Sequence, residues 1–274
     1  MLAWRVVRIR VGHSADPDDA FMFWAIEAGR VDTRGLALEQ VVSDIETLNG
    51  WAGSGRLEVT ALSLGAYPGV ATRYVLLPHG ASLGLGYGPV VVARTDLDPG
   101  DLLATEIVIP GRLTTAFLVL RLALGVEPAV RELRFDLIGD EVVSGRADAG
   151  LLIHEGQLTY EGSGLRKVLD LGAWWLAETG LPLPLGVNAA RRDLGQRLAD
   201  VSAVLSAAIA TGLDHRDEAL AYAERFGRGI DRETADRFVA MYVNDFTRDL
   251  GDVGRAAVAE LLRRSGAGVE ADYA

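Results

Sequence analysis

The side chain best placed for chemistry is the imidazole of His154, which ends a strongly apolar run. The run reads Ala149-Gly150-Leu151-Leu152-Ile153-His154-Glu155-Gly156 and predicts a buried strand followed by a loop. Open α/β sheets bind ligands at the carboxyl ends of their strands, and an imidazole there can act as a general base near neutral pH. The alternative is a histidine that is simply hydrogen-bonded at the edge of the core.

A second candidate is the loop at residues 12–19, which joins an apolar strand to an apolar helix. It contains the hydroxyl of Ser14, an imidazole and three carboxylates, among them Asp19. The free amides at the start of the helix could hold an anion. The alternative is plain capping of the helix by Asp16 or Asp18. The two roles are compatible, so the loop indicates only where a ligand could lie.

Two later strand-to-helix connections add hydroxyl groups. One predicted strand ends at Ser63, with Ala61 and Leu62 beside it. A later proline–glycine loop, in which the glycine allows close approach to a ligand, places Thr114 and Thr115 at a helix start. In both places the hydroxyl could contact a substrate or cap the helix that follows.

The composition excludes several classes of partner and cofactor. The chain has 27 basic and 38 acidic residues, a net charge of −11 and no basic run, so we expect neither nucleic acid nor a membrane surface as a partner. Cysteine is absent, which removes disulfides, thiolate metal sites and a cysteine nucleophile. No histidine pair has metal-ligand spacing, and Gly84-Leu85-Gly86 is not a dinucleotide fingerprint. We therefore expect a small-molecule ligand and no metal or cofactor.

The first eleven residues predict a strand rather than a secretory signal. Arginines interrupt each short apolar stretch, and Val7, Ile9 and Val11 alternate with Arg8 and Arg10. No later segment is long and apolar enough to span a bilayer. We expect a cytoplasmic protein.

Strands and helices alternate over the first two thirds of the chain, which predicts largely parallel sheets covered by helices. Further strands are predicted at 36–42, 57–62, 89–94, 107–109, 133–137, 151–154, 168–171 and 183–188. Helices are predicted at 20–26, 45–52, 116–124, 140–145, 191–212, 215–226, 231–246 and 252–265.

This order predicts two α/β lobes with a ligand cleft between them. One lobe would comprise residues 1–93 plus 188–274, including the C-terminal helices, and the other residues 94–187. The chain would cross between the lobes near residues 93 and 187. Loops of both lobes would hold the ligand, as in solute-binding proteins of the periplasmic type. Apolar residues exposed on the C-terminal helices would allow a homodimer.

Several motifs together resemble one enzyme family in order and spacing. In chain order they are Gly12-His13-Ser14-Ala15-Asp16-Pro17-Asp18-Asp19-Ala20-Phe21-Met22-Phe23, Asp44-Ile45-Glu46-Thr47-Leu48-Asn49, Pro110-Gly111 with Thr114-Thr115-Ala116, Leu152-Ile153-His154-Glu155-Gly156, Asp170-Leu171-Gly172-Ala173-Trp174-Trp175, Gly180-Leu181-Pro182-Leu183-Pro184-Leu185-Gly186 and Tyr242-Val243-Asn244. The chain resembles the 1,4-dihydroxy-6-naphthoate synthases of the futalosine route to menaquinone, over nearly its whole length.

The resemblance implies a two-lobed, periplasmic-binding-protein-like (type II) fold and a lyase that needs no cofactor. Its substrate would be a carboxylated futalosine derivative, cyclic dehypoxanthinyl futalosine, and its product 1,4-dihydroxy-6-naphthoate. His154 would take up a proton, while Ser63 with Leu62 beside it, and Thr114 with Thr115, would contact the substrate. Ala61, Ser14 and Asp19 complete the set of candidate substrate contacts. The first loop departs from the family pattern Ser-Pro-Cys-Pro-Asn-Asp-Thr-Phe at Asp18 and Ala20, among other positions, so contacts from those two positions do not follow from the resemblance.

Two alternatives share the expected fold. A binding protein without catalysis would use the same cleft, although the sequence predicts neither a signal peptide nor a lipoprotein cysteine. A chorismate dehydratase, the sister enzyme of the same pathway, would not call for the His154-Glu155 motif. A third alternative, the effector domain of a transcription factor, is disfavoured because no helix-turn-helix segment precedes the first strand.

Overall fold

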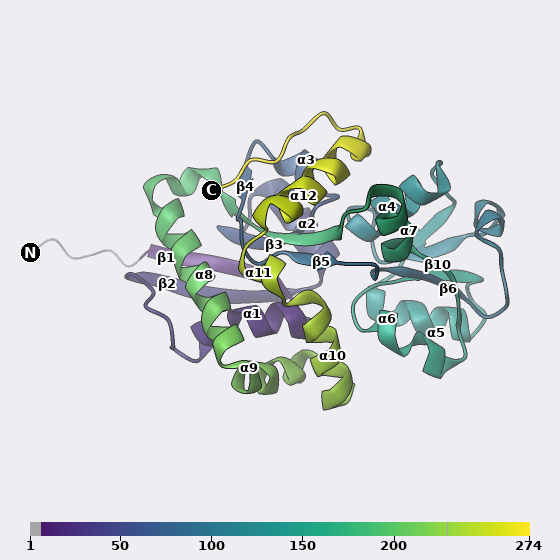
Figure 1. Cartoon of the computed structure of the whole chain (residues 1–274), viewed down its shortest axis with the longest axis horizontal. Coiled ribbons are helices and arrows are strands. Elements are labelled where there is room, and N and C mark those ends of the chain that lie inside the picture. The colour runs from purple at the N-terminus through teal and green to yellow at the C-terminus, as the bar shows by residue number, and fades with distance from the viewer. Residues whose placement is uncertain (1–6, 229) are drawn as a thin grey trace, which may run out of the picture.

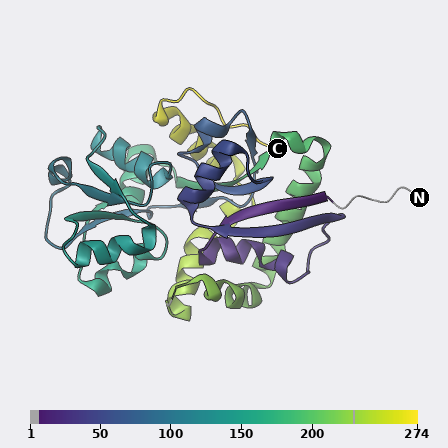
Figure 2. The ribbon, with the colours of Figure 1, turned by 180° about the vertical axis from the view of Figure 1, so that it is seen from behind.

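Two mixed β-sheets lie side by side in the computed structural model, and helices pack around each (Figure 1). The structure describes residues 7–228 and 230–274. The first sheet, its helices and the C-terminal helices form one lobe, and the second sheet with its shorter helices forms the other (Figure 2).

The first sheet has the strand order β2-β1-β3-β11-β4, and β5 also pairs with β11. Its strands are β1 (Val7–Ser14), β2 (Leu36–Ser43), β3 (Val59–Ser63), β4 (Tyr74–Leu76), β5 (Ser82–Gly84) and β11 (Leu183–Arg191). β1 is parallel to β2 and β3, whereas β11 is antiparallel to β3, β4 and β5. The parallel strands β1 and β3 therefore deliver their following loops to the same edge of the sheet.

The second sheet has the strand order β10-β6-β9-β7-β8. Its strands are β6 (Val90–Ala93), β7 (Ile107–Ile109), β8 (Val130–Glu132), β9 (Ala149–Leu152) and β10 (Arg166–Asp170). β9 is parallel to β7 and antiparallel to β6. The loops after β7 and β9 consequently open at one edge.

Helices follow most strands. They are α1 (Pro17–Glu27), α2 (Ile45–Ser54), α3 (Tyr67–Val70), α4 (Thr115–Leu124), α5 (Ile138–Val143), α6 (Gly156–Thr159), α7 (Leu171–Thr179), α8 (Leu198–Asp214), α9 (Arg216–Ala223), α10 (Arg232–Tyr242), α11 (Asp245–Arg248) and α12 (Gly251–Ser265). No helix in the described part of the chain is both long and apolar enough to cross a membrane.

Three predictions need correction. The segment 133–137 is not a strand. The edge of β7 that it could pair with is occupied by β8, which pairs with all three residues of β7. The last hydrogen bond of this ladder runs from the Leu133 amide to the Ile109 carbonyl. The predicted helix 191–212 begins only at Leu198, because β11 extends to Arg191 and the non-helical φ of 55° at Gly195 interrupts the turn between them. Both predicted lobe boundaries also shift. The strand β6, expected in the first lobe, hydrogen-bonds within the second sheet, because its partners β9 and β10 both lie there. Residues 183–187, expected in the second lobe, belong to β11 and pair with β3 and β5 of the first sheet.

The first of the two chain crossings between the sheets therefore lies before Val90. At this crossing the chain runs very close to α7. A Cβ atom on Gly172 would lie 2.1 Å from the Tyr87 carbonyl carbon. Only glycine can occupy this position without moving backbone.

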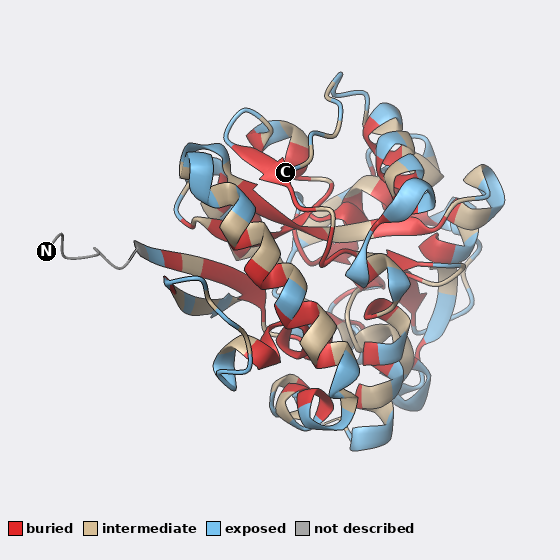
Figure 3. Cartoon of the chain, turned by 60° about the vertical axis from the view of Figure 1, so that its left-hand side comes forward, coloured by how far each residue is buried: buried red, intermediate tan, exposed pale blue. Residues whose placement is uncertain are grey.

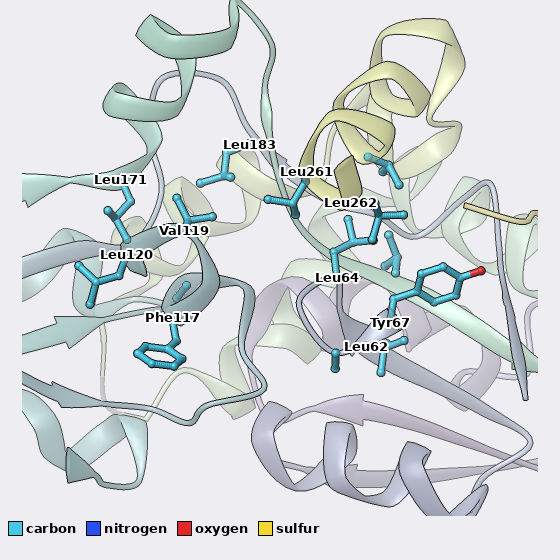
Figure 4. Close-up of a cluster of buried hydrophobic side chains, with 14 of the residues drawn as sticks. Leu62, Leu64, Tyr67, Phe117, Val119, Leu120, Leu171, Leu183, Leu261 and Leu262 are labelled. Carbon is cyan, nitrogen blue, oxygen red and sulfur yellow. The ribbon is translucent and has the colours of Figure 1, made fainter. Parts of the chain in front are cut away.

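Buried residues concentrate on the strands and on the inner faces of the helices (Figure 3). They form a core in each lobe and one cluster that both lobes share. α1 buries Phe21 and Phe23 against Ile9 and Val11 of β1. The shared cluster joins Leu62, Leu64 and Tyr67 of the first lobe to Phe117, Val119 and Leu120 of α4, and α12 contributes Leu261 and Leu262 (Figure 4). This continuous apolar packing fixes how the loops of the two lobes face each other.

Candidate functional site

A cavity lies where the strand-to-helix loops of the two lobes meet. It is open to solvent on one side and has a volume of about 100 Å³. The structure brings all eight predicted residues together in its wall: Ser14, Asp19, Ala61, Leu62, Ser63, Thr114, Thr115 and His154. Five further polar residues also line it: Asp16, Asp18, Ser82, Gln157 and Tyr242. Of these, the sequence had indicated Asp16 and Asp18 only as possible caps of the first helix.

The sequence had predicted that His154 is the last residue of a strand. The structure places it instead in the turn after β9. β9 ends at Leu152, and His154 has a left-handed backbone with φ of +53°. Its side chain is 16% exposed, and Nδ1 lies 2.8 Å from Oδ2 of Asp16. The other ring nitrogen, Nε2, is buried without a partner among the described residues. A basic nitrogen on a cavity-lining side chain is therefore left for a ligand.

Asp16 occupies the N-cap position of α1, but its side chain does not cap the helix. The carboxylate instead accepts hydrogen bonds from the Ser14 hydroxyl and from Nη2 of Arg228, the latter at 2.8 Å to Oδ1. It is 1% exposed. The backbone amide of Ser14 donates to Asp19 at 2.6 Å. The first loop is therefore built to aim Asp16 at His154.

Burial and the neighbouring charges set the protonation of these groups. Burial alone would lower the pKa of His154, but the charge and hydrogen bond of Asp16 outweigh it and raise that pKa above its usual value. Burial would raise the pKa of Asp16, yet His154 and Arg228 hold it well below its ordinary range. Burial, with the neighbouring carboxylates, raises the pKa of Asp18 to about 8 and of Asp19 to about 6. At pH 7 Asp16 is thus ionised, Asp19 is mostly ionised and Asp18 is mostly protonated.

Arg228, in the turn before α10, closes the network. Nε and Nη2 donate to the two oxygens of Glu155 at 2.9 and 2.8 Å, and Nη1 donates to the Ala15 carbonyl. The guanidinium also lies over the Phe135 ring, 4.5 Å from its centroid. No sequence motif marks Arg228, which is 212 positions from Asp16, so only the tertiary structure could reveal it.

Ser63 is held by Asn49 of α2 through two hydrogen bonds. The Asn49 amide donates to Ser63 Oγ at 3.0 Å, and its carbonyl oxygen accepts from the Ser63 backbone amide at 2.9 Å. No acceptor for the Ser63 hydroxyl proton is found in the described ranges 7–228 and 230–274. Ser63 can therefore donate to a ligand in the cavity.

Thr114 and Thr115 use their hydroxyl protons within the protein. Thr114 donates to the Gly111 carbonyl and caps α4 by accepting from Phe117, while Thr115 donates to the Leu185 carbonyl. The capping alternative is thus correct for Thr114. The groups that α4 offers to an anion are the backbone amides of its first turn, beside these threonines.

The other three histidines are not part of the cavity wall. His13 stacks on Phe23 and is fully buried, and burial lowers its pKa. His79 bonds to Ser202, and burial lowers its pKa to about 4. His215 is exposed at the end of α8. Among the described residues, no group of three or more His, Asp or Glu side chains is arranged to hold a metal ion.

Known proteins resemble the chain over most of its length. A family model described as menaquinone biosynthesis matches residues 9–267. A 1,4-dihydroxy-6-naphthoate synthase of Thermus thermophilus is 45% identical over 256 residues, 93% of this chain and 92% of that protein. A crystal structure of an Archaeoglobus fulgidus protein superposes with a TM-score of 0.90 at 46% identity, covering 95% of this chain and 97% of that one.

The fold has a wider distribution. The alkanesulfonate-binding protein of Xanthomonas axonopodis pv. citri has a TM-score of 0.67 at 13% identity, covering 88% of this chain and 86% of that chain. At that identity the likeness concerns the fold alone. It confirms the predicted periplasmic-binding-protein-like architecture.

Proposed function

The chain belongs to the 1,4-dihydroxy-6-naphthoate synthase family of menaquinone biosynthesis, and on that premise we propose its reaction and its base. It converts cyclic dehypoxanthinyl futalosine into 1,4-dihydroxy-6-naphthoate with release of the sugar-derived fragment. His154 is the general base of this lyase reaction. The observation that carries the proposal is the buried, unpartnered Nε2 of His154, on a ring whose Nδ1 is bound to Asp16.

The hydrogen bond to Asp16 suits His154 to proton uptake. Because an ionised carboxylate can only accept, Nδ1 of the neutral ring must carry the proton, and Nε2 then presents its lone pair. The Asp16 charge also stabilises the imidazolium that forms when Nε2 takes a proton from the substrate. Such a base contributes roughly 10²–10⁴-fold to the rate.

Two other features suit a carboxylated substrate with sugar oxygens. The first-turn amides of α4 carry partial positive charge and could bind the substrate carboxylate. The Ser63 hydroxyl, held by Asn49, could donate to a sugar oxygen. Ser14 and Asp19 bond to their own loop, so we propose that they shape the wall and support Asp16.

Proton transfer followed by aromatisation needs no electron carrier, so we propose a cofactor-independent reaction. The base removes a proton from carbon or a hydroxyl, and the gain of aromaticity supplies driving force. The residues placed in the cavity can perform this proton transfer and hold the substrate.

Incubation of the purified protein with cyclic dehypoxanthinyl futalosine tests the proposal, with the naphthoate followed by absorbance and mass. Chorismate serves as the parallel substrate. We expect product from the futalosine derivative and at least a 10²-fold loss of kcat in His154→Asn. His215→Asn is the matched control, because His215 lies outside the cavity, and it should keep full activity.

Three results would contradict parts of the proposal. Near-wild-type turnover by a folded His154→Asn variant would refute the assignment of the base. Turnover of chorismate alone would identify the sister enzyme. A ligand-induced rise in melting temperature without turnover of either compound would indicate a binding protein.

A further inference from the structure

We propose that Arg228 is a positioning residue for the base: it clamps the groups that surround the His154 ring and so holds that ring in place for proton transfer. The inference rests on the proposed role of His154. Arg228 itself has no contact with the His154 side chain among the interactions of the site and is placed to act through its neighbours.

Arg228 contacts two groups that touch the His154 ring and also the residue that follows His154 in the chain. Asp16 Oδ2 accepts from Nδ1 of His154 and Oδ1 accepts from Nη2 of Arg228, each at 2.8 Å. Phe135 lies edge-on to the His154 ring, 4.7 Å between centroids, and its face carries the Arg228 guanidinium. Glu155, the next residue along the chain, accepts two hydrogen bonds from Arg228. The Arg228 guanidinium thus holds in place Asp16, which accepts the hydrogen bond of the base, Phe135, which packs on its ring, and Glu155, which follows it in the chain.

These contacts also join the two lobes at the base. Asp16 follows β1 of the first sheet, while Glu155 and His154 follow β9 of the second. Arg228 precedes α10, which packs on α1 and β5 of the first lobe. The Asp16–His154 pair forms between the lobes, and Arg228 is the cation that bonds to both sides of it.

The backbone of Arg228 indicates that these contacts hold it in place. Its φ of +46° lies in the left-handed region, which a residue with a Cβ atom avoids. Such a conformation persists when surrounding interactions determine it, and it is commonest at functional sites. The side chain is 27% exposed, and its guanidinium donates to Asp16, Glu155 and the Ala15 carbonyl.

Arg228 also affects the protonation of His154, because several carboxyl groups face the ring. Four carboxyl groups lie around the ring: Asp16, Asp18, Asp19 and Glu155. The neutral Tyr242 hydroxyl, bonded to Gln157, lies in the same cavity. Arg228 is the cation paired with this acidic group. Without it, the imidazolium form of His154 would be favoured and less neutral base would be present near pH 7.

Titration of the His154 imidazole by NMR tests the proposal without any substrate. The chain has four histidines, and exposed His215 serves as the internal reference. In Arg228→Met we expect the pKa of His154 to rise by roughly one unit, because the substitution removes a positive charge that is bonded to Asp16 and Glu155 beside the ring. Arg225→Met removes a neighbouring arginine that stacks on Tyr222 and should leave the titration unchanged.

Kinetics on the proposed substrate supply the second measurement. Arg228→Met should lower kcat about 10-fold and move the acid limb of the kcat/KM profile upward by the same unit. Arg228→Lys keeps the charge but loses the two-pronged bond to Glu155. It should restore the pH profile to within about 0.3 unit while kcat stays several-fold low.

The outcomes separate the two proposals. If the wild-type protein forms product and needs His154, but Arg228→Met leaves both the His154 titration and kcat unchanged, the role of Arg228 is refuted. A shifted titration with unchanged kcat also refutes it. If His154→Asn is fully active, the proposed base is wrong, and the substrate-free titration still measures whether Arg228 controls the ring.

Discussion

Replacing Asp16 by asparagine should disable the base while leaving the shape of the site intact. The substitution keeps the volume of the side chain and removes the charge that lies 2.8 Å from Nδ1 of His154. Without that charge, burial is the dominant remaining influence, and burial lowers the pKa of His154. The acid limb of the kcat/KM profile should therefore move to lower pH, opposite to the shift expected for loss of Arg228.

The size of this shift follows from the geometry. Charges about 4 Å apart interact with roughly 4 kcal/mol at an effective dielectric constant of about 20, equivalent to about three pH units. Arg228 shares Asp16, and the His154 side chain is 16% exposed, so we expect about one to two units. At the pH plateau kcat should fall by roughly 10²-fold, because a neutral amide neither fixes the tautomer nor stabilises the imidazolium.

Stability should change with pH in a defined direction. His154 has a raised pKa in the folded state, so its pairing with Asp16 stabilises the protein fully below pH 6.5 and ceases to do so as the pH rises through the folded-state value. Asp16→Asn should therefore cost more free energy of unfolding at pH 5.5 than at pH 8.5, measured by urea titration at both.

The control for this variant is Asp200→Asn, which removes an exposed carboxylate paired with Arg34 and should change neither profile. An Asp16→Asn enzyme with an unmoved acid limb and full kcat would refute the reasoning. So would a limb that moves to higher pH.

Three further predictions concern the cavity wall and the lobe crossing. Ser63→Ala should raise KM about 3–10-fold with little change in kcat, the effect of losing one neutral hydrogen bond, seen in steady-state kinetics. Asp18→Asn should stabilise the protein by roughly 1–3 kcal/mol more at pH 8 than at pH 4. The folded-state pKa of Asp18 is raised to about 8, so between those pH values the carboxyl ionises in the unfolded chain while it stays protonated in the folded one, and the wild type loses stability. In urea titrations, Gly172→Ala should lower the free energy of unfolding by about 1–3 kcal/mol because its Cβ would meet the Tyr87 backbone. Gly139→Ala, in α5 with open space around it, should raise that free energy by about 0.5–1 kcal/mol.

Each of these has a result that would contradict it. An unchanged KM in Ser63→Ala, with the exposed Ser54→Ala as control, would mean that the hydroxyl does not touch substrate. An equal effect of Asp18→Asn on stability at the two pH values would mean that Asp18 ionises freely. A Gly172→Ala protein as stable as Gly139→Ala would show that the crossing can move apart.

Much of the fold and the location of the site could be predicted from local sequence, because they depend on short-range patterns. Apolar runs ending in Ser63 and His154 mark strand ends, and strand ends of parallel sheets gather at one edge. Six polar candidates, with Ala61 and Leu62, were therefore expected in one cavity, and the structure places all eight in its wall. Helix starts such as Thr114 follow equally local capping rules.

Only the tertiary structure determined which side chains pair in the cavity and which of them carry a proton. The Asp16 carboxylate could cap α1 or reach across the cavity, and the choice depends on His154 and Arg228, which are far apart in the chain. The sheet that β6 joins depends on partners β9 and β10, which its own four residues do not specify. Local propensities act over a few residues, whereas these choices are made by burial and charge contacts between segments that meet only after folding.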